Sequence, residues 1–366
     1  MFSRGLFFFL GAFFSVGVSS QTLPSCDYVT TGKCFYKGNV YEGTSGNIKT
    51  KDFYEGEVLN RHFHGRGTYW YFEDGPNKGD KYEGEFIAGL MTGMGTYYFN
   101  NGEKYVGNFK KGLRDGFGTN YFVDGMVFEG NFVSGIKQKG IEIYPNGDRY
   151  EGSFANNKAN GFGTFYMIAD DKNKGDRYQG NFKDGIFSGK GVYFFNSGNK
   201  YEGMFANGFP NGHGVYYMLA NNEFKGGRFE GKFLMGEYSG VGAYYYPSGA
   251  KSVCEYLNNK CNGFGVYLSE NKSKYVGEYQ NNLRHGQGIL YNPTGGIISQ
   301  GLWSEGKFVS TQAVSSTVLQ KANQVLSLAT GGKSELPKKK ITANADSPMQ
   351  KCKNLGLTEG GKDFEL

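Results

Sequence analysis

Aromatic residues and glycines recur along most of this chain at a nearly constant spacing, with polar residues between them. The copy at Tyr150 reads YEGSFANNKANGFGTFYM, in which an aromatic residue precedes a glycine, a second aromatic residue and later a Gly-x-Gly pair. Recurrence every 22–28 residues, as from Phe128 to Tyr150 and from Tyr150 to Tyr178, predicts a repeat architecture. Copies open at Tyr54, Tyr82, Tyr105, Phe128, Tyr150, Tyr178, Tyr201, Phe229 and Tyr275, with a degenerate copy at Ser252 and a half copy at Ser299.

Each copy predicts a β-hairpin. Tyr150, Gly152 and Phe154 alternate with Glu151 and Ser153, which places the two sets on opposite faces of a strand. The aromatic and β-branched segment after each Gly-x-Gly pair favours a second strand. The polar segment 156–160 is expected to form the turn between the two strands. Because strand follows strand with only turns between them, the sheet is expected to be an antiparallel meander.

Composition indicates how such a sheet forms its core. The chain has 60 glycines among 366 residues, and 28 tyrosines and 32 phenylalanines match them in number. Rings from adjacent strands can lie across the missing side chains and cover the backbone, which suits a sheet without a second layer. The predicted fold is therefore all-β, an elongated, twisted, single-layer antiparallel meander of hairpins.

The two ends differ from the array. A cysteine-containing N-terminal cap is expected over 21–40, the repeat array over 41–308, and a flexible basic tail over 331–366. Between array and tail, apolar residues at helical spacing predict a helix over 310–330, which Ser310 or Thr311 would cap. We expect it to pack on the last hairpin, although a membrane-surface helix is the alternative. The apolar positions are Val314, Val318, Leu319, Ala322, Val325, Leu326 and Ala329.

Residues 1–20 have the pattern of a secretory signal peptide. Arg4 precedes an apolar stretch over 5–18 that is shorter than the roughly 20 residues a bilayer requires, and small residues allow cleavage between Ser20 and Gln21. An uncleaved anchor is the alternative. The protein is expected to be exported, to the periplasm, to the cell surface or into the medium.

Five cysteines suit an oxidising compartment. Cys26 and Cys34 form one candidate disulfide, and Cys254 and Cys261 form a second. Cys352 is left without a predicted disulfide partner. Metal binding is not indicated, because neither pair has C-x2-C spacing and no histidine lies near them.

Little in the sequence points to catalysis or to a bound metal. The four histidines, His62, His64, His213 and His285, lie near Gly-x-Gly pairs and are interpreted as structural turn residues. Segment 171–176 resembles a calcium loop but lacks the glutamate at position twelve, so a long hairpin turn is expected there. One carboxylate per repeat predicts a solvated stripe rather than a catalytic pair. We predict no enzyme activity and no cofactor.

These repeats resemble the MORN repeat (membrane occupation and recognition nexus). Tyr82-Glu-Gly-Glu-Phe, followed by Gly89, Gly93 and Gly95, matches its signature closely, and the resemblance covers about residues 41–308. The first and last segments of the chain are similar to those of exported bacterial MORN proteins. The resemblance implies a single-layer sheet and a role in scaffolding, dimerisation or lipid-headgroup binding. Nothing in the chain resembles the kinase or SET methyltransferase domains that accompany some MORN arrays.

Two functions follow from these patterns. The first is a non-catalytic exported scaffold that binds another protein or itself, as a homo-oligomer. The alternative is a peripheral module that binds an anionic phospholipid surface through basic loops and the tail. A net charge of +6 is too modest to indicate nucleic-acid binding. The candidate contacts with an anionic surface are Lys110, Lys111, Arg114, Lys137, Lys139, Lys338, Lys339 and Lys340.

Overall fold

A computed structural model of the protein describes residues 31–37 and 52–331, and the side chains of residues 52–329. The chain divides into two compact units, residues 1–100 and 101–366, which are described separately. Several sequence predictions lie outside the described residues: the signal peptide with Ser20 and Gln21, Cys26, Cys352, and the tail with Lys338, Lys339 and Lys340.

The described residues of the first unit form five strands. Each pairs antiparallel with the next one along the chain. They are β1 (Thr31–Lys37), β2 (Phe53–Leu59), β3 (His62–Trp70), β4 (Lys81–Ile87) and β5 (Leu90–Tyr98).

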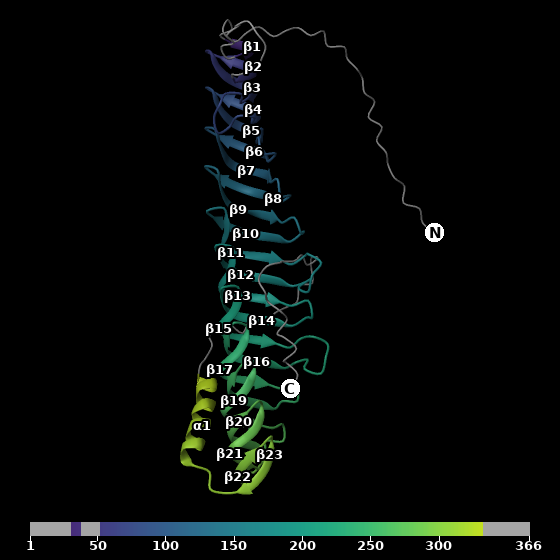
Figure 1. Ribbon diagram of the computed structural model, residues 1–366, viewed down its shortest axis with the longest axis vertical. Helices are drawn as coiled ribbons and strands as arrows, with labels where there is room; N and C mark the ends of the chain where they lie inside the picture. The colour runs from purple at the N-terminus through teal and green to yellow at the C-terminus, as the bar shows by residue number, and fades with distance from the viewer. Residues whose placement is uncertain (1–30, 38–51, 332–366) are drawn as a thin grey trace, which may run out of the picture. The chain divides into compact units, whose positions relative to one another are not determined.

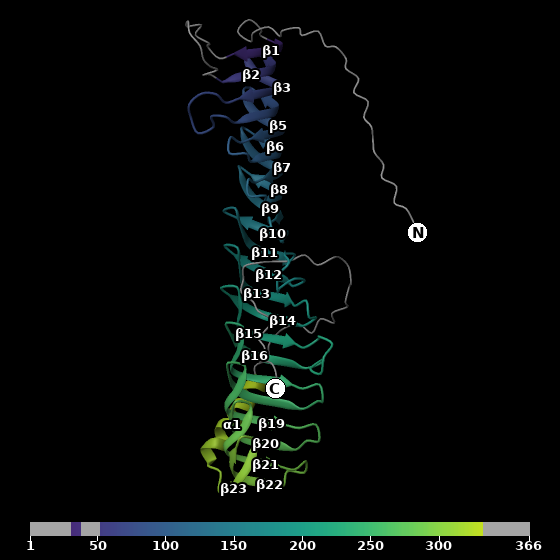
Figure 2. The ribbon, with the colours of Figure 1, turned by 45° about the vertical axis from the view of Figure 1, so that its right-hand side comes forward.

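The second unit continues the same pattern and adds a helix. Strands β6 to β23 follow one another in sequence order, as Figures 1 and 2 show, and neighbours pair antiparallel. The predicted open antiparallel meander with a C-terminal helix is confirmed. The elements are β6 (Lys104–Lys110), β7 (Leu113–Tyr121), β8 (Val127–Val133), β9 (Ile136–Ile143), β10 (Arg149–Ala155), β11 (Lys158–Tyr166), β12 (Arg177–Lys183), β13 (Ile186–Phe194), β14 (Lys200–Ala206), β15 (Phe209–Tyr217), β16 (Arg228–Leu234), β17 (Glu237–Tyr245), β18 (Lys251–Leu257), β19 (Lys260–Leu268), β20 (Lys274–Gln280), β21 (Leu283–Tyr291), β22 (Ile297–Ser304), β23 (Lys307–Thr311) and α1 (Ser316–Gly331).

The hairpin β10–β11 illustrates the repeat. Gly152 lies opposite Gly163, and the register shifts beyond this pair. Asn156 and Asn157 form the turn with φ of 50° and 60°, the left-handed values that a two-residue type I′ turn requires. The polar segment 156–160 is therefore not all turn, because β11 already begins at Lys158. The tight turn leaves the remaining polar residues to extend the second strand.

The opening aromatic residue of each copy, here called the anchor, forms the core. Tyr150 is fully buried, and its ring occupies the space that a side chain on Gly163 would need, since a Cβ there would lie 2.5 Å from the ring. Gly152 and Gly163 thus accommodate the same ring. The prediction that rings cover the glycines is confirmed, with one refinement: the ring lies along its own strand and reaches the neighbouring strand from there.

The helix does not lie where the sequence analysis placed it. It begins at Ser316, and the Ser315 hydroxyl accepts a hydrogen bond of 3.3 Å from the Val318 amide, so Ser315 is the N-cap rather than Ser310 or Thr311. The residues before it extend β23 to Thr311. Helix α1 then turns back across β17 to β21 instead of packing on the last hairpin (Figure 1).

The histidines also differ from their predicted positions. His62, His64, His213 and His285 lie within strands β3, β15 and β21 and not in turns. The turns within the hairpins are two residues long, unlike the longer connections between copies. The segment before each Gly-x-Gly pair therefore already belongs to the second strand of its hairpin.

Candidate functional site

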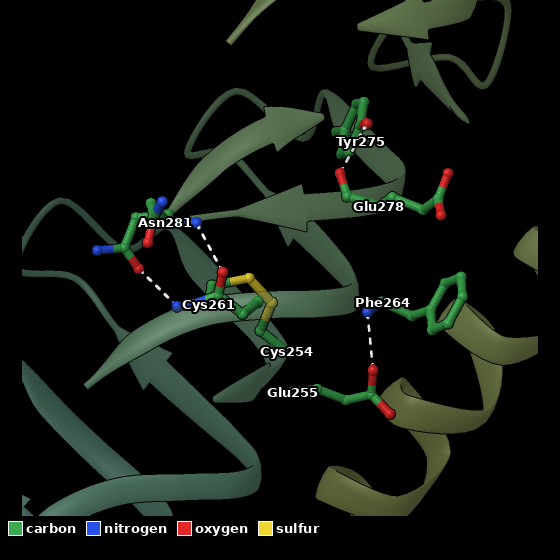
Figure 3. Close-up of a disulfide and its surroundings, with 9 residues drawn as sticks. Cys254, Glu255, Cys261, Phe264, Tyr275, Glu278 and Asn281 are labelled. Carbon is green, nitrogen blue, oxygen red and sulfur yellow. Dashed lines mark hydrogen bonds between the residues drawn. A yellow bond between two sulfur atoms is a disulfide. The ribbon is translucent and has the colours of Figure 1, made fainter. Parts of the chain in front are cut away.

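One face of the second unit carries α1 and is called the helix face. Val325 packs with Ala243 and Val253, and all three are buried. Ala322 is fully buried in a neighbouring cluster. Figure 3 shows the Phe264 ring directed toward the helix. These contacts come from the alternation along the strands, which directs every second residue to this face.

The residue after the anchor is apolar in the two copies beneath the helix. In most copies this residue is polar, as in Glu151, Glu202 and Glu230, and in the two copies beneath α1 it is Val253 and Val276. A valine at this position can be buried by a helix without desolvating a carboxylate. Val106 also follows an anchor, so a single valine does not mark a helix site, but Val253 and Val276 lie in successive copies and together form apolar surface that α1 covers. Two successive copies with valine at this position were the sequence signal for the helix site, and no expectation was drawn from them.

An open groove continues along the helix face beyond the last turn of α1. It encloses about 890 Å³ above strands β11 to β17, with Leu328 and Ala329 of α1 at one end. Most of its lining is glycine backbone and apolar side chains. The lining residues are Phe162, Gln179, Gly180, Lys190, Gly191, Val192, Glu202, Gly203, Met204, His213, Gly214, Val215, Glu230, Gly231, Lys232, Val241, Gly242, Leu328 and Ala329.

Large apolar side chains in the groove are exposed. The exposed fraction is 60% for Phe162, 37% for Met204 and 57% for Leu328. Charged groups lie around them, and Glu202 forms an ion pair of 3.0 Å with Lys200. Contiguous exposed apolar surface with a polar rim is typical of an interaction site.

The opposite face contains a second concavity, here called the tyrosine pocket, at the copy that departs most from the repeat. An ordinary anchor fills the space between strands, as Phe229 does by stacking on Tyr238 at 3.7 Å between ring centroids. Ser252 stands at the anchor position of the next copy and has no ring. A space of about 510 Å³ remains, lined by Ser197, Asn199, Tyr216, Met218, Ala220, Asn222, Phe224, Tyr238, Tyr244, Tyr246, Ser252, Tyr256, Asn259, Cys261, Tyr267, Tyr279, Asn282, Leu283, Arg284 and Gly306.

Two cysteines lie beside this pocket. Cys254 occupies the glycine position of the degenerate copy, and Cys261 lies on the next strand with a Cα–Cα distance of 5.7 Å. The two sulfur atoms lie at disulfide-bonding distance (Figure 3). The Cys261 amide donates a hydrogen bond of 2.7 Å to the Asn282 side chain. Of the other predicted pair, Cys34 lies in β1 and Cys26 lies outside the described residues.

The basic residues predicted to meet an anionic surface fall into two groups. Lys110, Lys111 and Lys139 are exposed. The Arg114 guanidinium instead lies over the rings of Tyr105 and Phe132. It also donates hydrogen bonds to Asn120 and to the Gly135 carbonyl.

The interpretation of Lys137 as a loop residue is wrong. It lies in β9, is 5% exposed and forms an ion pair of 2.5 Å with the buried Glu142. Lys137 occupies a core position of its copy, where an internal carboxylate offsets the cost of burying the ammonium group.

Segment 171–176, which was predicted to form a long turn rather than a calcium loop, follows strand β11. Asp176 is fully buried and accepts hydrogen bonds from the Tyr193 hydroxyl at 2.6 Å and from the Asn196 amide at 2.7 Å. Its carboxylate thus connects the long turn to the next hairpin. Within the described ranges, no three His, Cys, Asp or Glu side chains are grouped so that they could hold a metal ion. Among these residues no helix is both long enough and apolar enough to cross a membrane.

The repeats match a known family. The MORN repeat pattern matches ten segments, which together make up more than half of the chain: 54–73, 82–104, 105–127, 128–149, 150–167, 178–200, 201–218, 229–251, 255–274 and 275–297. The chain belongs to the MORN-repeat family. The resemblance inferred from the sequence is confirmed within 54–297, and its predicted first part, residues 41–51, lies outside both these matches and the described residues.

Solved structures provide more distant likenesses, and no curated protein matches this MORN-repeat chain. The TCP10 domain of Danio rerio CPAP in complex with a peptide of Danio rerio STIL is 12% identical, with a TM-score of 0.35 over 65% of this chain and 94% of that one. The TCP domain of Drosophila melanogaster SAS-4, in complex with a proline-rich motif of Ana2, is 9% identical, with a TM-score of 0.22 over 50% of this chain and 81% of that one.

Proposed function

We propose that this MORN-repeat chain is a non-catalytic exported scaffold whose open groove binds an amphipathic helix of a partner protein. The observation that carries the proposal is that the groove is continuous with the surface on which α1 is bound. Helix α1 is bound on the helix face over β17 to β21, and the groove continues from the last turn of α1 over β11 to β17. A helix placed there would extend a packing arrangement that this face already uses.

The chemistry of the partner helix follows from α1. Its buried residues Val318, Ala322 and Val325 are small and spaced along one stripe, which suits the shallow surface of a sheet. The groove floor offers Val192 and Val215 among glycines, so it suits a stripe of similar size. A basic residue on the flank of the partner helix would meet the carboxylate of Glu230, which forms no ion pair with any described residue.

Export is supported by the sequence pattern of residues 1–20. The alternative function, binding to an anionic phospholipid surface, is supported by fewer described residues than the groove is. Eight basic residues were predicted as its contacts. Lys110, Lys111 and Lys139 are exposed, Arg114 lies over rings and Lys137 is paired with Glu142, and the other three lie outside the described residues. The groove therefore favours a protein partner.

The test compares three forms of the full chain: wild type, the groove variant Phe162→Ser/Met204→Ser, and the control Phe117→Ser. Phe117 lies between the two glycines of an earlier copy, as Phe162 does, is 51% exposed and lies outside the groove. Because all three side chains are exposed, the fold should survive these changes. Affinity capture from the native host is quantified for each form, and hydrogen–deuterium exchange locates the protected strands in the complex.

The proposal predicts capture of a partner that protects β11 to β17. The amount of partner captured should fall at least about tenfold in the groove variant. The Phe117→Ser variant should capture it as well as wild type does. Equal capture by the groove variant, or protection away from the groove, would refute the proposal. Light scattering tests self-association: a dimer that the groove variant abolishes would make a second copy the occupant and contradict a distinct partner.

A further inference from the structure

Three copies place a cation at the same core position, and they differ in the hydrogen-bond or ion-pair partner of that cation. The position is the second residue of the hairpin's second strand, occupied by Arg114, Lys137 and Arg284. The Arg114 guanidinium donates a hydrogen bond of 2.8 Å to the Asn120 side chain. The Lys137 ammonium is paired with Glu142. In both copies the acceptor comes from further along the same strand.

Arg284 has no such acceptor among the residues that the structure describes. Leu290 stands six residues after Arg284, where Asn120 stands after Arg114. The guanidinium lies over the rings of Tyr275 and Trp303, at 5.1 and 5.2 Å from their centroids. None of the described carboxylates forms an ion pair with it. Arg284 is thus a half-buried cation that retains its hydrogen-bonding capacity, and it lines the tyrosine pocket.

A second donor lies next to it. Tyr279 is directly opposite Arg284 in the register of β20 and β21, and it also lines the tyrosine pocket. Its hydroxyl is buried and has no hydrogen-bond partner among the described residues. Burial raises the pKa of Tyr279 well above its usual value despite the opposing effect of Arg284, so the hydroxyl keeps its proton and can donate it. A buried donor without an acceptor is costly, and a ligand oxygen would relieve that cost.

The remaining lining adds donors and flat rings but no negative charge. The side-chain oxygens of Asn259 and Asn282 already accept hydrogen bonds from backbone amides, so donors remain on their amide nitrogens. No Asp or Glu is among the described residues that line the pocket. The rings of Tyr216, Tyr244, Tyr246, Tyr256 and Tyr267 form much of the wall.

We infer that the tyrosine pocket binds a small organic carboxylate with a flat apolar body. Its carboxylate would accept hydrogen bonds from the Arg284 guanidinium and the Tyr279 hydroxyl, and its body would lie against the tyrosine rings. A carboxylate carries one negative charge, which one guanidinium balances, and it accepts from the planar guanidinium fork in a bidentate geometry. The volume of about 510 Å³ is that of a small-molecule site. This site lies on the face opposite the groove and does not depend on the proposed function.

The experiment measures binding to the full chain by isothermal titration calorimetry with four probes. Benzoate contains both the ring and the carboxylate, benzyl alcohol lacks the charge, acetate lacks the ring, and phenyl phosphate replaces the carboxylate by a group of higher charge. The inference predicts that benzoate binds at least about tenfold more tightly than benzyl alcohol and acetate, because both halves of the ligand are recognised. It also predicts weaker binding of phenyl phosphate.

Four variants locate the site. Arg284→Gln should weaken benzoate about tenfold or more, and Tyr279→Phe should weaken it several-fold through the loss of one hydroxyl. Arg114→Gln is the matched control, because Arg114 also stacks on two rings but lies outside the pocket, and it should leave the affinity unchanged. Arg284→Lys retains the charge and is expected to recover part of the affinity lost in Arg284→Gln, which separates anion binding from loss of fold.

Several results would overturn the inference. Benzyl alcohol binding as tightly as benzoate would make the pocket a neutral site. Tighter binding of phenyl phosphate would make it a phosphate site. An unchanged benzoate affinity in Arg284→Gln, or no binding of any probe at millimolar concentration, would contradict it directly.

Discussion

The Tyr150 hydroxyl donates a hydrogen bond of 2.8 Å to the carbonyl of Ser153, three residues further along the chain. The ring between these groups covers Gly152 and Gly163. The same bond recurs in other copies, for example from Tyr178 to Asn181 at 2.9 Å. The anchor therefore both fills the core and satisfies a carbonyl next to the register shift, where the ladder is interrupted.

This relationship predicts different costs for two substitutions of one residue. Tyr150→Phe should cost about 1 kcal/mol, since it removes one hydrogen bond, and the chain itself has phenylalanine at anchors 128 and 229. Tyr150→Ala should cost roughly 3–5 kcal/mol, because it also opens a cavity over the glycines. Repeats unfold locally, so amide exchange in β10 and β11 is the measurement. Equal effects of the two changes would contradict the packing role of the ring.

The glycine beneath the ring gives a second prediction. Gly163→Ala places a Cβ 2.5 Å from atoms of the Tyr150 ring, which must then move out of the core. We expect a loss of about 1–3 kcal/mol or more in local stability. Gly75→Ala is the control, because nothing lies within 4 Å of its Cβ and its φ is not positive, and it should change stability by less than about 0.5 kcal/mol. Both are measured by amide exchange in the strands beside the substitution.

Buried tyrosines predict alkaline unfolding. Burial raises the pKa of Tyr105, Tyr244 and Tyr246 to about 12, compared with about 10 in an unfolded chain. A raised tyrosine pKa means that the folded state favours the protonated hydroxyl, so the stabilisation is complete below pH about 10 and is lost as the pH rises toward 12. Far-ultraviolet circular dichroism and tyrosinate absorbance should change together in this window. Full ionisation near pH 10 with the sheet intact would contradict it.

The sequence predicted the hairpins well because local pattern determines them. Alternation in the YEGSF segment and the ring-to-glycine spacing are both properties of one copy, and the structure repeats them. The helix was misplaced for a different reason. Its stripe through Val318, Ala322 and Val325 predicts packing on an apolar surface but does not say which surface. That surface belongs to copies that end well before the helix begins in the sequence.

The two concavities were also beyond a pattern-based prediction, although signals for them exist. The tyrosine pocket arises where Ser252 replaces an anchor, and the sequence analysis identified this copy as degenerate without inferring an empty space. The unpaired guanidinium of Arg284 could be recognised only by comparing its copy with that of Arg114. Asn120 accepts a hydrogen bond from Arg114, whereas the equivalent residue after Arg284 is Leu290, which has no acceptor. Lys137 was misjudged because charge suggests a surface, whereas Glu142 allows its burial.

The cysteine pair predicts a specific bond. Cys254 and Cys261 should be joined in protein prepared under oxidising conditions, and peptide mapping without reduction should recover both residues in one linked species. Closing so short a loop stabilises by about 2–3 kcal/mol in the chain-entropy model. Reduction should therefore increase amide exchange in β18 and β19 but not in β10 and β11, which serve as the internal control. Free thiols at both positions would contradict the prediction.

The docking of α1 makes the last prediction. Ala322 is fully buried in a cluster with Val266 and Val276, so Ala322→Glu forces an unpaired carboxylate into an apolar contact or displaces the helix. Displacement is the expected result, because α1 is 16 residues long and its stability depends on this contact. Exchange should then rise throughout α1 and in β18 to β20. Gln320→Glu adds the same charge at an exposed position of the same helix and should leave exchange unchanged. Protection of α1 retained in the Ala322→Glu variant would show that the helix is held by other contacts.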